Sequence, residues 1–337
     1  MGIIIIFLSL VLLIAPSFKK VPVCVTALCA SIFCLILAPL TGATAGTGFI
    51  DFIISGMTGA EASFLTSFKE YIINNIAVFL VIAALGVLYE ISGADDAIAE
   101  IIVERLGSKA IIPMIFLIGV LISFGGLSGF LALFLMGPIT ISLFKEGDIP
   151  RYMFSPVCLA GIGISFIWVP GAEQHGILFP AAVTGVAIHQ WSIQGIILAI
   201  LETIAIVMFV RYYIQHIRMN GEHYELTETD KEIILTKDYS SRVNWITAVI
   251  PMIVLLVLVK LVKISLLFSV LTSILVAVIF FNKTLRASYF LKVVEKNIKE
   301  GALFLINTAA IIGFTYIIQL IPTYRSLGGL IANFVLK

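Results

Sequence analysis

The 33 residues from Ile111 to Leu143 contain no Asp, Glu, Lys or Arg. About 20 apolar residues are enough for one helix to cross the hydrocarbon core of a bilayer. The run is therefore too long for one crossing, and it has no polar turn for two. Its middle, Gly125-Gly126-Leu127-Ser128-Gly129, is a natural point for a helix to reverse. The pattern predicts a re-entrant hairpin over about 111–143.

The composition of the whole chain extends this prediction. Of the 337 residues, 60% are hydrophobic and only 12% are charged, about half the charged share of a soluble domain. The net charge is +1 and no basic run is long enough to follow a phosphate backbone. These values exclude a soluble enzyme, a disordered protein and a nucleic-acid binder. We expect an all-α polytopic protein of a bacterial inner membrane, whose surroundings are the lipid bilayer.

The distribution of basic residues predicts the orientation, because cytoplasmic loops carry an excess of Lys and Arg. The segment Gly42–Asn74 holds a single lysine, so we place it outside. Both ends of the 111–143 run are then cytoplasmic, as a re-entrant hairpin requires. The basic segments that we place inside are 19–20, 105–109, 145–151, 211–242 and 283–299.

The chain also resembles itself. Residues Phe79–Tyr89 align with Ile306–Tyr316, and the spans before them correspond as well. The two copies run in opposite directions in the topology above, which predicts an inverted repeat, the architecture of secondary transporters. The counterpart of the hairpin would begin only after Lys337, so we expect an incomplete second repeat. The predicted divisions are a first repeat over 1–215, a cytoplasmic connector over 216–242 and a partial second repeat over 243–337.

A helix predicted over about 153–188 is interrupted at Trp168–Gly176. Pro170 removes a backbone donor, and irregular backbone at membrane depth is tolerated where it lines a cavity. The freed N–H groups and the helix N-terminus that follows suit a carboxylate. The alternatives are a surface loop at this break and simple helix packing at the glycine tip. The candidate substrate-binding residues are Gly125, Gly126, Ser128, Gly129, Pro170, Gly171, Glu173, Gln174, His175, Asn307 and Thr308.

Glu202 is the acidic residue of the otherwise apolar stretch Leu198–Val210. A carboxylate at that depth is costly and usually faces the protein interior. We expect Glu202, Glu173 or His175 to carry a coupling proton; for Glu202 a structural hydrogen bond to a neighbouring helix is the alternative. A short charged helix, capped by its aspartates, is expected to begin near Asp95. No metal-ligand spacing, phosphate loop or dinucleotide fingerprint is present, so no metal or cofactor is expected.

Several motifs match those of a known family: 85–94, 98–107, Gly125-Gly126, Pro138, 143–151 and Pro170-Gly171 with Pro180. With these motifs the chain resembles the gluconate:proton symporter family of the ion transporter superfamily, and its hydroxybutyrate-type branch more than its sugar-acid branch. The resemblance implies cation-coupled symport of a small hydroxy-carboxylate such as gluconate or 3-hydroxybutyrate, usually with protons, with sodium as the other coupling ion. It also implies no enzymatic activity, a homodimer, and two hairpins and two broken helices around one site. We expect this chain to lack the second hairpin and the second broken helix. After Pro170-Gly171 it has Ala172-Glu173-Gln174-His175, where the resemblance implies a small hydroxyl residue and other polar groups.

Two other functions fit parts of the sequence. The incomplete second repeat favours a carrier fragment that is inactive or depends on a partner. Gly126-Leu127-Ser128-Gly129 has the Gly-x-Ser-Gly form of rhomboid-like intramembrane serine proteases, and His175 could act as its base. No His-x-x-x-Asn helix precedes the serine, which argues against the protease.

Overall fold

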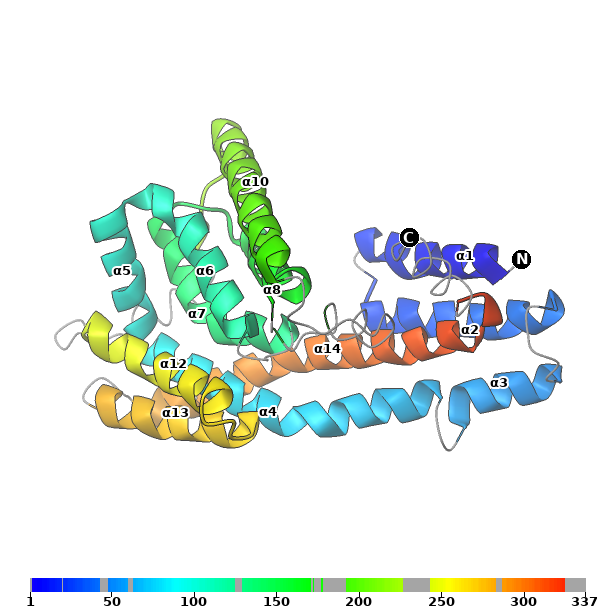
Figure 1. Ribbon diagram of the computed structural model, residues 1–337. Helices are drawn as coiled ribbons and strands as arrows, with labels where there is room; N and C mark the ends of the chain where they lie inside the picture. The colour runs from blue at the N-terminus through cyan, green and yellow to red at the C-terminus, as the bar shows by residue number, and fades with distance from the viewer. Residues whose placement is uncertain are drawn as a thin grey trace. The chain divides into compact units, whose positions relative to one another are not determined.

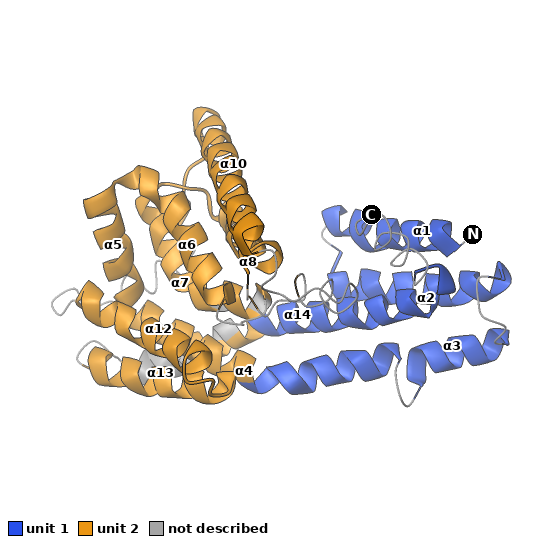
Figure 2. Cartoon of the chain, viewed as in Figure 1, with its two compact units in different colours: residues 1–77, 300–337 blue, residues 78–299 orange. Residues whose placement is uncertain are grey.

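The computed structural model of the protein is helical throughout the part of the chain that it describes (Figure 1). This agrees with the predicted all-α class. The chain divides into two compact units, Met1–Ala77 with Glu300–Lys337, and Val78–Lys299 (Figure 2). These units are not the predicted repeats, so the division into repeats stays a prediction. The described residues are 2–19, 21–42, 48–59, 63–124, 129–170, 172, 177, 192–226, 243–282 and 287–324.

Five helices among these residues are long and apolar enough to cross a bilayer. A sixth is added if the bent pair Ala94–Leu106 and Ser108–Phe124, with an angle of 116° between its parts, is one span. The prediction of a multi-pass membrane protein is therefore confirmed by length and composition. The five are Gly2–Lys19, Val23–Leu40, Phe64–Ser92, Ser192–Met219 and Gly301–Leu320.

The first unit is built on close contacts between small residues. Ala27, Ala30 and Cys34 are fully buried on one face of α2, at the spacing of a helical stripe. A Cβ atom added at Gly313 would lie 2.8 Å from Phe64 Cδ2, so only glycine allows this approach. The unit holds α1 (Gly2–Ile14), η1 (Ala15–Lys19), α2 (Val23–Leu40), α3 (Phe49–Thr58), the start of α4 (Phe64–Ser92) and the end of α14 (Ala287–Leu320).

The second unit contains both arms of the predicted hairpin and the first half of the predicted broken helix. The helix over 192–219 packs against the helices over 111–124 and 154–167, whereas the helices over 245–260 and 266–281 pack against each other (Figures 1 and 2). Besides the remaining parts of α4 and α14 it holds α5 (Ala94–Leu106), η2 (Ser108–Ala110), α6 (Ile111–Phe124), α7 (Gly129–Glu146), η3 (Arg151–Met153), α8 (Phe154–Ile167), α10 (Ser192–Met219), α12 (Trp245–Lys260) and α13 (Leu266–Phe281).

The two arms of the predicted hairpin are α6 and α7, which pack against each other. Helix α6 has 14 residues and α7 has 18; at 1.5 Å per residue these rise about 21 and 27 Å, less than a hydrocarbon core of about 30 Å. The helices stop and restart at the glycine-rich stretch, where the sequence predicts the reversal. Residues 125–128 themselves lie outside the described part.

Helices α6 and α8 approach each other more closely than ordinary side chains permit. A Cβ atom on Gly161 of α8 would lie 2.9 Å from the Cα atom of Phe116 on α6. A Cβ atom on Gly119 would lie 3.2 Å from the carbonyl carbon of Gly161. Such small-residue crossings are a common way for membrane helices to associate. This crossing fixes the hairpin arm α6 on the first half of the broken helix.

Three features of this unit differ from or limit the sequence predictions. Helix α8 ends at Ile167, before Pro170 as predicted, but the second half of the broken helix lies outside the described residues. The sequence predicts spans over Val243–Leu261 and Ser265–Phe281. The corresponding helices α12 and α13 have only 16 residues each, or about 24 Å. A sharp corner at Gly107, whose φ is +77°, separates α5 from α6 and was not predicted.

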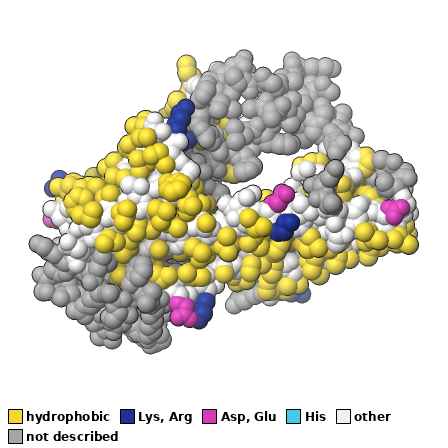
Figure 3. Space-filling model, turned by 90° about the horizontal axis from the view of Figure 1, so that it is seen from below, with side chains coloured by type: hydrophobic (Ala, Val, Ile, Leu, Met, Phe, Trp, Pro, Cys, Tyr) yellow, Lys and Arg dark blue, Asp and Glu magenta, His cyan; other side chains and the backbone are white. Residues whose placement is uncertain are grey.

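The outer surfaces of these helices are apolar. On α10, Ile197, Leu201, Ile204 and Met208 are all more than half exposed. Figure 3 shows one face on which hydrophobic side chains predominate and charged ones are scattered. An apolar exterior of this kind is what a lipid-facing surface requires.

Candidate functional site

The candidate site begins where the hairpin meets α8. Of the four predicted hairpin residues, Gly125, Gly126 and Ser128 lie outside the described residues, and Gly129 is the first residue of α7. A Cβ atom on Gly129 would be 3.6 Å from Ile162 Cγ2, an ordinary van der Waals distance. The described end of the hairpin tip therefore rests on the second half of α8.

The break after α8 lies against the first turn of α10. A Cβ atom on Gly195 would be 2.6 Å from the carbonyl oxygen of Trp168 and 3.2 Å from Pro170 Cγ. Glycine thus allows the backbone of α10 to touch the irregular segment. Ala172, inside the break, is fully buried. The remaining predicted residues of the break, Gly171, Glu173, Gln174 and His175, lie outside the described part of the chain.

Glu202 is on the same side of α10 as this contact. It follows Gly195 by seven residues, which is two helical turns, or about 10.5 Å along the axis. Its Oε2 atom is buried and has no hydrogen-bond partner among the described residues. A buried polar atom without a partner costs free energy, so such an atom in a native structure calls for an explanation.

Asn307 and Thr308 belong to the other compact unit. The Oδ1 atom of Asn307 accepts a hydrogen bond of 2.9 Å from the backbone N–H of Cys24, in the first turn of α2. Thr308 is buried and donates its hydroxyl to the carbonyl oxygen of Phe304, one turn earlier, at 2.9 Å. Both polar groups are thus engaged in helix contacts, and their predicted role at the substrate stays a prediction.

Lys260 brings a positive charge to the tip end of the hairpin. It is the last residue of α12, and its Nζ atom lies 4.8 Å from the ring centroid of Phe124, the last residue of α6. A cation over an aromatic face is a favourable contact. No local pattern in the sequence connects Lys260 with the hairpin.

The aspartates at the start of α5 do not cap that helix, contrary to the expectation. The hydroxyl of Ser142 on α7 lies 3.0 Å from Asp95 Oδ2 and 2.9 Å from Asp96 Oδ1. Asp95 is only 3% exposed. The aspartates therefore join α5 to the second arm of the hairpin. No local pattern reveals this contact, because 46 or 47 residues separate the partners.

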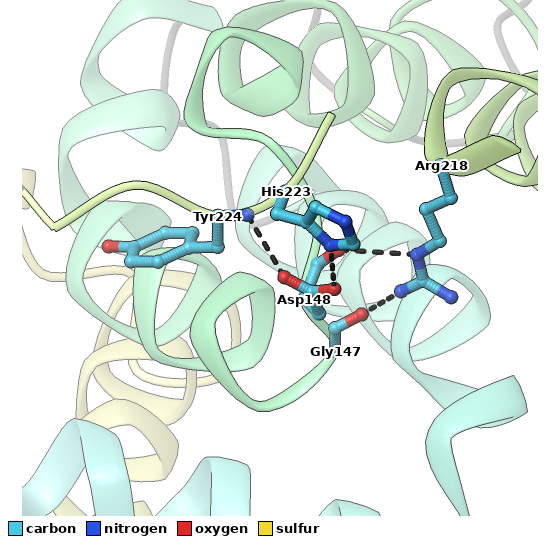
Figure 4. A network of polar contacts seen from close by, with 5 residues as sticks. All are labelled: Gly147, Asp148, Arg218, His223 and Tyr224. Carbon is cyan, nitrogen blue, oxygen red and sulfur yellow. Dashed lines mark hydrogen bonds and ion pairs between the residues drawn. The ribbon is translucent and has the colours of Figure 1, made fainter. Parts of the chain in front are cut away.

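A network of polar contacts surrounds Asp148, in the turn after α7 (Figure 4). Its carboxylate lies 2.7 Å from His223 Nδ1 and accepts a 3.0 Å hydrogen bond from the backbone N–H of Tyr224. Arg218, near the end of α10, donates to the carbonyl oxygens of Asp148, at 3.2 Å, and of Gly147. The hydrogen bond from His223, followed by that from Tyr224, holds the pKa of Asp148 below its usual range.

Among the described residues, no group of three or more His, Cys, Asp or Glu side chains is arranged to hold a metal ion.

Comparison with known proteins gives one informative relative. No model of a known protein family matches the chain. The chain is 26% identical over 148 residues to the uncharacterized transporter YxjC of Bacillus subtilis (strain 168). The matched segment is 44% of this chain and 31% of that relative. The resemblance to a transporter is thus distant and partial, and it specifies no family.

Proposed function

We propose that this chain is a membrane transporter that carries a small hydroxy-carboxylate together with a proton. Three findings support the transporter class: the distant similarity to a bacterial transporter, the five candidate spans and the apolar exterior. The proposal makes the chain a carrier and not an enzyme. The substrate class follows from the family resemblance of the sequence motifs and from the chemistry of the residues discussed next.

The observation that carries the coupling proposal is the buried Oε2 atom of Glu202. An ionised carboxylate without a partner is costly in an apolar helix bundle, whereas the protonated acid is neutral. In the proposal Glu202 takes up a proton in one state of the carrier and releases it in the other. Its position two turns from the Gly195 contact with Pro170 allows the proton to respond to a change at the break.

The anion is proposed to bind between the hairpin tip and the break. Gly129 borders this region on one side and Pro170 on the other, and α8 connects them. In the proposal main-chain N–H groups of the tip and the break bind the carboxylate, as helix ends in secondary transporters do. Lys260 beside Phe124 supplies positive charge near the tip, which favours an anion over a cation.

Uptake by purified protein in lipid vesicles tests the function. Labelled gluconate and 3-hydroxybutyrate are added with the external buffer either more acidic than the vesicle interior or at the same pH. We expect the acidic external buffer to accelerate accumulation of the labelled substrate in vesicles that contain the protein. Replacing Glu202 by Gln should reduce acid-driven accumulation by about tenfold or more, the size of a typical coupling free energy, while exchange of internal for external substrate persists. Glu295→Gln, at an acid two-thirds exposed beside Lys299, is the matched control.

Each alternative gives a different result. If the Glu202→Gln variant accumulated as much substrate as the original protein under acidic external buffer, the proposed role of Glu202 in proton coupling would be wrong. Acceleration by sodium in place of acid would make sodium the coupling ion. A shift in melting temperature with a hydroxy-acid but no uptake would favour a carrier that depends on a partner. Covalent labelling of Ser128 by a fluorophosphonate would favour the protease.

A further inference from the structure

Two arginines of α10 reach the two ends of the hairpin base. Arg211 donates to the carbonyl oxygen of Lys109, in the short turn that leads into α6. Arg218 donates to the carbonyl oxygen of Gly147, directly after α7. The arginines are seven residues apart, so they lie on one face of α10 about 10.5 Å from each other along the axis. One helix thus contacts both the entrance and the exit of the hairpin.

The contact between Arg218 and the turn after α7 is chemically favourable. The last carbonyl groups of a helix have no partner within it and carry the negative end of the helix dipole, which favours a cation. A guanidinium presents several donors in a fixed plane. Arg218 uses two of them, on the carbonyl oxygens of Gly147 and Asp148. This pair of hydrogen bonds fixes the position of the turn as well as its distance from α10.

A second contact reinforces the exit. Helix α10 ends at Met219, and the φ of +82° at Gly221 allows the chain to turn back, with the Glu222 N–H donating to the Ile217 carbonyl. The turn brings His223 and the Tyr224 N–H to the carboxylate of Asp148 (Figure 4). Asp148 itself has a φ of +48°, a left-handed conformation that aspartate tolerates better than most residues. The exit turn is therefore held at both its backbone and its side chain.

We propose that Arg211, bound to Lys109, and Arg218, bound to the turn at Gly147 and Asp148, form a brace. This brace holds the base of the α6–α7 hairpin on α10, so that the hairpin and α10 move as one body. These arginines are positioning residues, since none of their described contacts is at the tip or the break. The brace lets a change at Glu202, on the same helix, act on the hairpin. Its role in transport rests on the proposed function, whereas its role in holding the hairpin base does not.

Hydrogen–deuterium exchange of the purified protein tests the physical part. In an Arg211→Ala, Arg218→Ala double variant, we expect amides of residues 108–112 and 143–150 to exchange about tenfold faster, because hydrogen bonds from charged donors are lost. Lys299→Ala is the control, since this exposed cation pairs with Glu295 on α14 and lies outside both segments. Unchanged exchange at both ends of the hairpin would overturn the brace.

Uptake kinetics test the transport part. We expect the double variant to lose about fivefold or more in maximal uptake rate, with the substrate KM within about twofold of the original. Arg→Lys substitutions keep the charge and one donor, so they should restore part of the rate. Faster exchange with an unchanged rate would reduce the brace to a structural contact and overturn its role in transport.

Two further outcomes separate this proposal from the proposed function. If no hydroxy-acid is taken up by the original protein, the proposed function fails, and exchange alone decides the brace. If the double variant does not fold, Asp148→Asn replaces it, because Asn tolerates the left-handed conformation and keeps the acceptor for the Tyr224 N–H. That variant should still speed exchange in residues 218–226, and no change there would contradict the side-chain part of the brace.

Discussion

At the scale of single residues, the described polar groups fall into two sets with different surroundings. Glu202 and Lys260 lie within or at the ends of apolar helices. Asp148 and His223 are about half exposed, at 51% and 60% of their side chains. Charges in the first set are costly to place and point to binding or coupling. Those in the second set contribute through geometry, since water screens them.

The first prediction concerns the pH dependence of the Asp148 contacts. Because the pKa of Asp148 is lower in the folded protein than in the unfolded chain, its contribution to stability is present above the ordinary aspartate range. That contribution is lost as the pH falls through the lowered value. We expect Asp148→Asn to lower the melting temperature at pH 7 but not at a pH below the folded pKa. Thermal unfolding at both pH values measures this, and an equal difference at both would contradict it.

The second prediction concerns Lys260 and follows from the proposed site. Lys260→Ala should raise the KM for a carboxylate substrate about tenfold, equivalent to the loss of about 1.4 kcal/mol of attraction. Lys263→Ala, in the exposed turn three residues later, is the control and should leave the KM unchanged. Uptake at graded substrate concentrations measures both. Equal KM values for the two variants would show that Lys260 is only a helix-end lysine.

At the scale of helices, the crossing of α6 and α8 determines where the hairpin lies. Gly119 and Gly161 allow the two backbones to touch, and no bulkier pair would allow this. The crossing is near Ile162, which also contacts Gly129 at the tip end. Helix packing therefore places the hairpin tip against the part of α8 that precedes the break.

The third prediction tests this crossing. Gly161→Ala would place a Cβ atom 2.9 Å from the Cα atom of Phe116, and such overpacking destabilises by about 1–3 kcal/mol. Gly163→Ala, two residues along the same helix, meets no atom within 4 Å and should be neutral or stabilising by up to about 1 kcal/mol. Thermal unfolding in detergent compares them. Similar melting temperatures for the two variants would rule out a close crossing.

At the scale of the whole molecule, two compact units share the long helices α4 and α14. An apolar exterior covers much of the described surface (Figure 3). The sequence-based orientation adds a direction to this picture, because it places the hairpin base and the start of the connector on the cytoplasmic side. The orientation stays a prediction.

The fourth prediction tests that orientation. Asp51→Cys, in the segment placed outside, should react with a membrane-impermeant maleimide in intact cells. Glu222→Cys, after the basic end of α10, should react only after permeabilisation. Both original side chains are exposed. The unsubstituted protein, whose Cys29 is exposed, provides the background. The reverse pattern of labelling would invert the whole topology.

Much of the local architecture could be predicted from the sequence. The hairpin arms end at the glycine-rich stretch, and α8 ends before Pro170, because glycine and proline act on the backbone of their own turn. A helix beginning near Asp95 was also predicted correctly, but its caps were not. The inverted repeat and most of the predicted site residues stay predictions.

The sequence by itself determined that the helices are apolar enough to lie in a lipid bilayer, and it determined where several of them end. Both properties depend on short runs of residues. Only the tertiary structure decided which distant groups meet. Arg211 and Lys109 are 102 residues apart, and Asp148 and Tyr224 are 76 apart. No local preference of these residues selects such partners. The packing of α6, α7, α8 and α10 brings them within hydrogen-bonding distance, since close contact between helices depends on the shapes of all of them together.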